Sequence, residues 1–278
     1  MHLRFKNQAQ YISIMSNIKI KSALISVYYK DGLEEIIKTL IDQNVTIYST
    51  GGTQTFIESL GGNVVPVENI TGYPSILDGR VKTLHPKVFG GILAIRNDDH
   101  LGQLGQYDIP TIELVIVDLY PFEETVASTN NEETIIEKID IGGIALIRGA
   151  AKNYNDVVII PSKNEYPLLL EILKEGSGAS TLEQRKALAT HAFKVSSHYD
   201  TKIFEYFNKQ ESNLTVFKTS ILTSKTLRYG ENPHQKAQYF GDIHDIFEII
   251  GGKELSYNNL VDVDAAVRSA EADVDFAE

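Results

Sequence analysis

Short apolar segments that alternate with helix-patterned segments constrain the fold of this chain more than any other feature. Residues 22–27 (SALISV) and 45–49 (VTIYS) have the composition of buried strands. Between them, residues 32–43 place apolar side chains at the spacing of an amphipathic helix. A strand, a helix and a strand in this order predict an α/β fold with an open parallel sheet and flanking helices.

Four more strands are predicted, at residues 64–67, 91–95, 114–117 and 157–160. The open sheet would then contain five or six strands. Beyond Pro161 the pattern becomes mainly helical. There Ser180 is a candidate N-cap, with Glu183 at the capping-box position, for a helix that continues through Phe207.

The chain also divides into segments of different character. Residues 1–17 form a polar leader that we expect to be disordered or mis-started, because Met15 begins a more conventional start. The main domain is expected at residues 18–209, and a polar linker of low periodicity at residues 210–224. Residues 225–278 resemble the start of a new domain, and so few residues would be marginal as a domain by themselves.

Composition excludes several classes of function. The chain has no cysteine, which rules out thiolate metal sites and cysteine nucleophiles and suits a cytoplasmic protein. Its net charge of -11 argues against a nucleic-acid partner, because such binding needs many cations on one face. No apolar run approaches the roughly 18 residues that span a bilayer, so no membrane partner is expected.

A glycine pair between a predicted strand and helix is a candidate phosphate site. In Ser49-Thr-Gly-Gly-Thr53, backbone N–H groups and hydroxyls could converge on an anion at the N-terminus of a helix. The alternative is a plain strand-to-helix turn with Thr53 as the N-cap. The segment matches neither the P-loop nor the dinucleotide-binding fingerprint.

A basic segment stands out in this acidic chain. Residues 78–86 (DGRVKTLHP) contain Arg80, Lys82 and His85, and Lys87 follows. Such a cluster is typical of anion capture, and a solvated charge run is the alternative. The interspersed apolar residues favour a function, although His85 alone is more often a structural residue.

Two later segments could supply acid–base chemistry. Tyr120 follows the apolar run 114–117, at a strand end of the kind where open α/β sheets bind ligands; an aromatic packing role is the alternative. Asp140 precedes a Gly142-Gly143 turn and a helix that carries Arg148 and Lys152 on one face. These groups would lie within reach of one site, unless the helix is simply a surface ion-pair helix.

Five motifs in a fixed order resemble one known family: Thr50-Gly-Gly-Thr53, Gly79-Arg-Val-Lys-Thr-Leu-His-Pro86, Leu119-Tyr-Pro-Phe122, Ile139-Asp-Ile-Gly-Gly143 and Ala150-Ala-Lys-Asn153. They are similar to motifs of the bifunctional purine biosynthesis enzymes that join phosphoribosylaminoimidazolecarboxamide formyltransferase to IMP cyclohydrolase. Each motif is weak alone, but the ordered set is specific. Residues 227–235 (LRYGENPHQ) resemble the family's entry into its transformylase region.

The resemblance implies a methylglyoxal-synthase-like IMP cyclohydrolase domain at residues 18–209, followed by an incomplete α+β transformylase segment at residues 225–278. The implied substrate is a purine-precursor ribonucleotide, 5-formamido-imidazole-4-carboxamide ribonucleotide, which closes to inosine monophosphate. The cyclohydrolase would need no metal and no cofactor. The family's formyltransferase uses 10-formyltetrahydrofolate, which this chain is not expected to use because it stops before the family's catalytic Lys-His pair. A homodimer is expected by the same resemblance.

Site residues follow from the same resemblance. The reacting groups would be surrounded by Lys82, Tyr120, Asp140 and Lys152. Substrate and phosphate would be held by Ser26, Lys30, Thr50, Gly51, Gly52, Thr53, Arg80, Thr83, Gly142 and Gly143. In the transformylase region, Arg228 and Tyr229 would contact nucleotide.

The chain departs from the family pattern at Tyr28, Tyr29 and Asp118, where the family usually has Ser, Asp and Asn. Two other functions remain open from the sequence. One is a methylglyoxal-synthase-type lyase that acts on a phosphorylated triose. The other is a regulatory module that binds a nucleotide without converting it.

Overall fold

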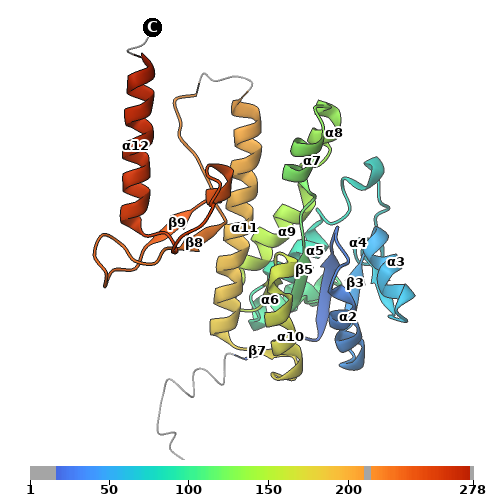
Figure 1. The fold of residues 1–278 in the computed structure, drawn as a ribbon. Coiled ribbons are helices and arrows are strands. Elements are labelled where there is room, and N and C mark those ends of the chain that lie inside the picture. Colours follow the sequence, from blue (N-terminus) through green and yellow to red (C-terminus); the bar gives the residue numbers. More distant parts are fainter. Residues whose placement is uncertain (1–16, 210–213, 276–278) are drawn as a thin grey trace, which may run out of the picture. The chain divides into compact units, whose positions relative to one another are not determined.

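The computed structural model describes residues 17–209 and 214–275. The chain forms two compact units, Met1–Gln210 and Glu211–Glu278 (Figure 1). Residues 1–16 of the expected leader lie outside the described residues. In the expected linker, residues 214–223 have no helix or strand.

A five-stranded parallel sheet forms the centre of the first unit, as the sequence predicts. Its strands, in the order β4-β3-β2-β5-β6, are β2 (Ser22–Ser26), β3 (Thr46–Ser49), β4 (Val64–Pro66), β5 (Leu114–Val117) and β6 (Val158–Ile160). All four residues of β5 are buried. Side chains alternate between the two faces of a strand, so both faces of the sheet are covered.

Helices cover this sheet, most of them between its strands and the last two after β6. They are α2 (Leu33–Asp42), α3 (Gly51–Ser59), α4 (Val67–Thr71), α5 (Pro86–Leu93), α6 (Asp98–Gln106), α7 (Phe122–Ser128), α8 (Glu132–Ile136), α9 (Gly142–Lys152), α10 (Tyr166–Lys174) and α11 (Leu182–Asn208), with short 3-10 turns at Leu77–Gly79 and Lys163–Glu165. The predicted amphipathic helix at 32–43 is α2. Its apolar positions Leu33, Ile36, Ile37 and Leu40 are all fully buried. Each contributes on the order of 2 kcal/mol by burial.

The predicted strand at residues 91–95 is wrong, because most of it lies in helix α5. Pro86 occupies the first turn of α5, where a missing N–H costs nothing. The His85 side chain caps the helix by accepting a hydrogen bond from the Lys87 N–H, with an Nδ1–N distance of 3.1 Å. A short apolar run does not distinguish strand from helix, and here the cap decides.

Helix α11 starts one residue later than predicted. Thr181 is the N-cap, and its capping-box partner is Gln184 rather than Glu183. Ser180 instead belongs to the short strand β7 (Ala179–Ser180), which pairs antiparallel with β1 (Ile18–Lys19). Ser180, which the local sequence favours as the N-cap of the helix, is therefore part of a strand pair instead.

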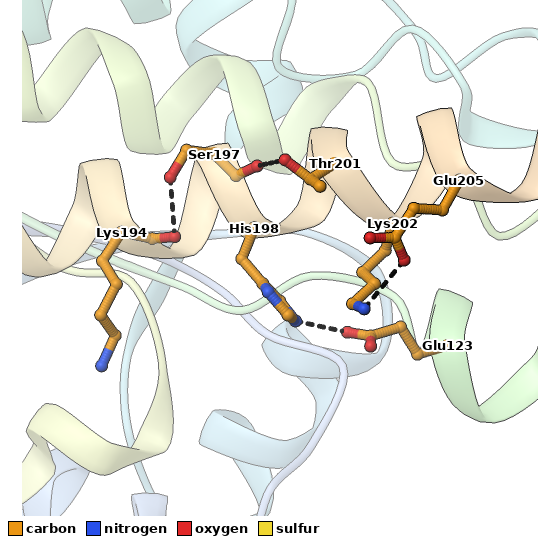
Figure 2. Close-up of polar contacts among 7 residues, drawn as sticks. All are labelled: Glu123, Lys194, Ser197, His198, Thr201, Lys202 and Glu205. Carbon is orange, nitrogen blue, oxygen red and sulfur yellow. Dashed lines mark hydrogen bonds and ion pairs between the residues drawn. The ribbon is translucent and has the colours of Figure 1, made fainter. Parts of the chain in front are cut away.

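Helix α11 packs along α9 and β6 and also contacts α7. Figure 2 shows the contact between His198 of α11 and Glu123 of α7, in which His198 Nε2 lies 3.0 Å from Glu123 Oε1. In the same view Thr201 donates to the Ser197 carbonyl at 2.7 Å. Since α7 begins two residues after Tyr120, α11 supports the turn that carries this tyrosine.

The strand order fixes the place of a site. From β2 the chain proceeds to β3 and β4 on one side, and later to β5 and β6 on the other side. Ser26 at the end of β2 is in register with Val117 at the end of β5. Ligands in open α/β sheets bind beyond the carboxyl ends of the strands at such a reversal.

The second unit has both strands and a helix, in line with an α+β segment. Strands β8 (Ser224–Thr226) and β9 (Gln238–Phe240) form a hairpin, and after a 3-10 turn at Ile243–Asp245 comes α12 (Tyr257–Asp275). Among the helices that the structure describes, none is long and apolar enough to cross a bilayer.

Candidate functional site

A cavity of about 760 Å³ lies at the carboxyl ends of β2, β3 and β5. Most of the residues that the sequence singles out line it together: Ser26, Lys30, Thr50, Gly51, Gly52, Thr53, Arg80, Lys82, Thr83, Tyr120, Asp140, Gly142 and Gly143. The switch point of the sheet therefore gathers segments that are more than 100 residues apart in the sequence.

Lys152 does not line this cavity. It is the last residue of α9, whereas Gly142 at the cavity is the first, so the helix rise separates them by about 15 Å. Arg148 also lies outside the cavity lining, and its guanidinium stacks 5.7 Å from the centre of the Phe193 ring. Positions four residues apart share a helix face, but each turn carries them farther from the N-terminus.

Arg228 and Tyr229 belong to the second unit. Arg228 Nη2 donates to the Tyr229 hydroxyl at 3.1 Å, and its guanidinium lies 4.8 Å from the ring centre. The Arg228 N–H donates to Leu255 O at 2.8 Å, and the Tyr257 N–H donates to Tyr229 O at 3.0 Å. These backbone contacts join the LRYGENPHQ segment to the start of α12.

The glycine pair opens helix α3, with Thr50 rather than Thr53 as the N-cap residue. Thr53 instead ties this helix to the end of β2. Its buried hydroxyl donates to Val27 O at 2.9 Å and accepts from the Val27 N–H at 3.1 Å. The N–H groups in the first turn of a helix lack helical partners, so this end of the cavity suits an anion.

Lysine side chains add positive charge beside this helix end. Lys82 reaches the glycine pair, since its Nζ lies 3.4 Å from the point that a Cβ on Gly51 would occupy. Lys30 turns back on its own loop and donates to the carbonyls of Val27 and Tyr28. Burial lowers the pKa of Lys30, and nearby Asp118 opposes this effect. Arg80 is ion-paired with Glu137, whereas no ion pair involves Lys82 within the described part of the chain.

Asp140 is a carboxylate that lines the cavity just before the start of α9. Its Oδ1 accepts a hydrogen bond from the Gly143 N–H at 2.6 Å. Burial raises the pKa of Asp140, while hydrogen bonds from the Gly143 and Tyr120 N–H groups work in the opposite direction. The raised pKa suits a group that takes up a proton and then returns it.

Tyr199 of α11 holds the Asp140 backbone in place. Its hydroxyl accepts a hydrogen bond from the Asp140 N–H at 2.7 Å and donates to Lys138 O at 2.7 Å. Burial raises the pKa of Tyr199 to about 12, so its hydroxyl stays protonated at neutral pH. The sequence pattern did not mark this residue.

Tyr120 lies near Asp140 and also contacts an aromatic neighbour. Burial raises its pKa, and the nearby Asp140 carboxylate adds to this effect. Its ring meets Tyr28 edge to face at 5.7 Å between centroids. Lys138 Nζ lies 5.5 Å from the Tyr28 ring centre and 5.6 Å from that of Tyr120. This Tyr28–Tyr120–Lys138 cluster forms one wall of the cavity.

Sequence reasoning missed Lys138 and gave Tyr28 and Asp118 no role. Asp118 accepts hydrogen bonds from the N–H groups of both Tyr28 and Tyr29, the second at 3.0 Å, and so fixes the loop after β2. Their position in the sequence could have marked two of these residues as members of the site. Asp118 directly follows β5, and Lys138 precedes Asp140 by two residues. Within residues 17–209 and 214–275, no group of three or more His, Asp or Glu residues could hold a metal ion.

Comparison with known proteins covers both units. The family model of the AICARFT/IMPCHase bienzyme matches residues 150–278, and that of the MGS-like domain matches residues 32–145. The crystal structure of ForH is similar with a TM-score of 0.59 and 33% sequence identity, over 67% of this chain and 98% of that one.

Curated relatives give the same result. The bifunctional purine biosynthesis protein PurH of Bacteroides thetaiotaomicron is 57% identical over 90% of this chain and 49% of its own length. That of Corynebacterium glutamicum is 47% identical over 90% of this chain and 50% of its own length. The chain thus spans about half the length of these relatives. Two family models in tandem and these relatives show that the chain belongs to the bifunctional purine biosynthesis (AICARFT/IMPCHase) family.

Proposed function

We propose that the cavity is an IMP cyclohydrolase site, which closes 5-formamido-imidazole-4-carboxamide ribonucleotide to inosine monophosphate with loss of water. One observation supports this proposal most: a helix end suited to a phosphate and the Asp140–Tyr120 pair line one cavity. A phosphorylated ligand held at one end would present its heterocycle to the acid–base groups at the other end. Family membership makes this chemistry the natural candidate.

The phosphate subsite would lie at the N-terminus of α3. Free N–H groups at Gly51 and Gly52 would donate to phosphate oxygens, and Lys82 would add a charge-assisted hydrogen bond. Ser26 and Thr50 line the same end of the cavity and could orient the ribose phosphate.

Ring closure needs one bond to form and one to break. The carboxamide nitrogen attacks the formyl carbon, which forms the new carbon–nitrogen bond and places negative charge on the formyl oxygen. The carboxamide nitrogen and the formamido nitrogen each lose one proton. Both protons leave with the formyl oxygen as water, and a carbon–nitrogen double bond results. All reacting atoms belong to one molecule, so positioning supplies a large part of the acceleration.

The residues divide this work by their position. Asp140 would take the proton from the carboxamide nitrogen and return it to the departing oxygen, for which its raised pKa is suitable. Tyr120 would orient the reacting groups. The backbone N–H group at Gly142 would stabilise the negative oxygen, since the Gly143 N–H donates to Asp140 and Lys82 would bind the phosphate. Lys152 would have no such role, because it lies outside the cavity lining.

Titration calorimetry with inosine monophosphate tests the phosphate subsite. We expect inosine monophosphate to bind more tightly than inosine. Lys82→Ala should weaken the binding of inosine monophosphate by about tenfold and leave the binding of inosine unchanged. Lys87→Ala is the matched control, because Lys87 belongs to the same basic segment but does not line the cavity. Equal affinities for the two ligands would contradict the proposed phosphate subsite.

A further inference from the structure

We propose that Gly79 is a positioning residue for Lys82: the missing side chain at residue 79 leaves the space through which the lysine reaches the cavity. The role of Lys82 in binding rests on the proposed function. The position of its side chain does not.

The turn around Gly79 brings the two residues together. Ile76 and Val81 form an antiparallel bridge, so the chain doubles back at Leu77–Gly79 and Lys82 follows directly after the bridge. Gly79 has a φ of +86°, in the left-handed region. Its N–H donates to Ile76 O at 3.0 Å, which closes the turn.

A Cβ on Gly79 would collide with the lysine side chain. It would lie 2.2 Å from Lys82 Cε, 2.7 Å from Nζ and 3.4 Å from Cδ. Real non-bonded carbon atoms do not approach so closely, so one group must move. The colliding atoms form the far end of a flexible side chain, which moves more easily than backbone. The expected result of a Gly79 substitution is therefore a displaced Lys82 rather than an unfolded domain.

The displacement matters because the end of the Lys82 side chain lies beside a second glycine. Its Nζ is 3.4 Å from the position of a Cβ on Gly51, in the glycine pair that opens α3. The lysine therefore runs between two glycines, one in the turn and one at the expected phosphate. A lysine pushed off Gly79 would lose its place beside α3.

Gly61 offers a matched control for the backbone. Its φ of +82° is close to that of Gly79, and no atom would lie within 4 Å of a Cβ placed there. It follows the C-terminal end of α3, away from the cavity lining. Gly79→Ala and Gly61→Ala thus impose a similar backbone strain, and only the first touches Lys82.

Affinity for inosine monophosphate gives the first readout. We expect Gly79→Ala to weaken binding by about tenfold, as loss of a charge-assisted hydrogen bond would, and Gly61→Ala to leave binding unchanged. In a Lys82→Ala background, Gly79→Ala should have no further effect, because no long side chain remains to collide. An equal loss in both backgrounds would overturn the proposal, as would an equal loss from Gly61→Ala.

A second readout does not depend on the proposed function. Acetic anhydride acetylates accessible lysines, and mass spectrometry gives the rate at each one. Lys82 is half-buried, so its rate should rise several-fold in Gly79→Ala and stay the same in Gly61→Ala. A changed rate in a chain that binds no nucleotide would refute the proposed function and support the positioning role. An unchanged rate in Gly79→Ala would overturn the positioning role, whatever the chain binds.

Discussion

Asp140 accepts a hydrogen bond from the N–H of Gly143 at 2.6 Å, so its carboxylate caps the helix end that faces the cavity. Asp140 is half-buried, and burial raises the pKa of its carboxyl group. A helix N-terminus favours the negative form, whereas burial disfavours it. This balance leaves a carboxylate that can take up a proton within the cavity.

Replacement of this carboxylate should separate activity from stability. In the native state the Asp140 pKa is raised, so the folded chain holds the proton more tightly than the unfolded chain. Asp140 therefore costs stability as the pH rises from its unfolded pKa through its folded one, and that cost persists at pH 7. We expect Asp140→Asn to keep or increase the melting temperature at pH 7 and to lower turnover by about 100-fold or more.

Melting temperatures of both proteins between pH 4 and pH 7 check this sign. The difference in favour of Asp140→Asn should grow as the pH rises. A difference that grows as the pH falls would mean that the ionised carboxylate stabilises the fold, contrary to the assigned pKa direction.

Removal of one hydroxyl from α11 should loosen the Asp140 loop. Tyr199→Phe deletes the acceptor of the Asp140 N–H and the donor to Lys138 O. Each buried group left without a partner costs about 1–3 kcal/mol, so we expect a lower free energy of unfolding together with lower turnover.

Tyr206→Phe is the control for this change. Both tyrosine rings pack against Phe122, with centroids at 6.1 and 5.9 Å. Among the described residues, no hydrogen bond of the Tyr206 hydroxyl is found. Urea denaturation should therefore show a lower free energy of unfolding for Tyr199→Phe and an unchanged one for Tyr206→Phe. Equal losses in both variants would point to ring packing instead.

The hydroxyl of Thr53 should matter more than that of its neighbour on the same helix. Thr53→Val keeps the branched shape but loses both hydrogen bonds to Val27, which join α3 to the end of β2. We expect a loss of about 1–3 kcal/mol in the free energy of unfolding. Thr55→Val, at an exposed position of α3, should change it far less. Equal effects in urea denaturation would exclude the Val27 contacts as the cause.

Arg185 should be the most sensitive position on α11. Only 1% of this residue is exposed, and it donates to the carbonyl oxygens of Tyr154, Asn155 and Ser180. Arg185→Ala leaves these acceptors unsatisfied and should lower the free energy of unfolding by about 3 kcal/mol. The adjacent Lys186 is exposed, so Lys186→Ala should cost little. A small loss for Arg185→Ala would show that water replaces the guanidinium without penalty.

The sheet was predictable because its signal is local. The apolar spacing of Leu33, Ile36 and Leu40 and the run of β5 describe core faces directly. The strand predicted at residues 91–95 was wrong because its local signal is ambiguous. A short apolar run is compatible with both a strand and a helix. The N-cap of α11 is Thr181 and not Ser180, because Ser180 pairs with the distant strand β1 as part of β7.

The site was only partly predictable, for a related reason. Loops at strand ends converge once the sheet order is known, and the motifs at Gly51 and Asp140 meet as that logic expects. Lys152 shares a helix with the Asp140 turn, but sequence spacing along a helix does not say which end faces the cavity. Lys138 and Tyr199 act through contacts over long sequence distances, which one sequence does not reveal.

Conversion of 5-formamido-imidazole-4-carboxamide ribonucleotide to inosine monophosphate by the purified chain is the direct test of the proposed function. Chromatography would follow the product for the wild type, Asp140→Asn, Lys82→Ala and the control Lys87→Ala. We expect turnover in the wild type and in Lys87→Ala, a collapse of turnover in Asp140→Asn, and about a tenfold higher KM in Lys82→Ala. A folded wild type that binds inosine monophosphate but forms none from the substrate would contradict the proposed function and favour a binding module. Full activity in Asp140→Asn would contradict the assigned proton transfer.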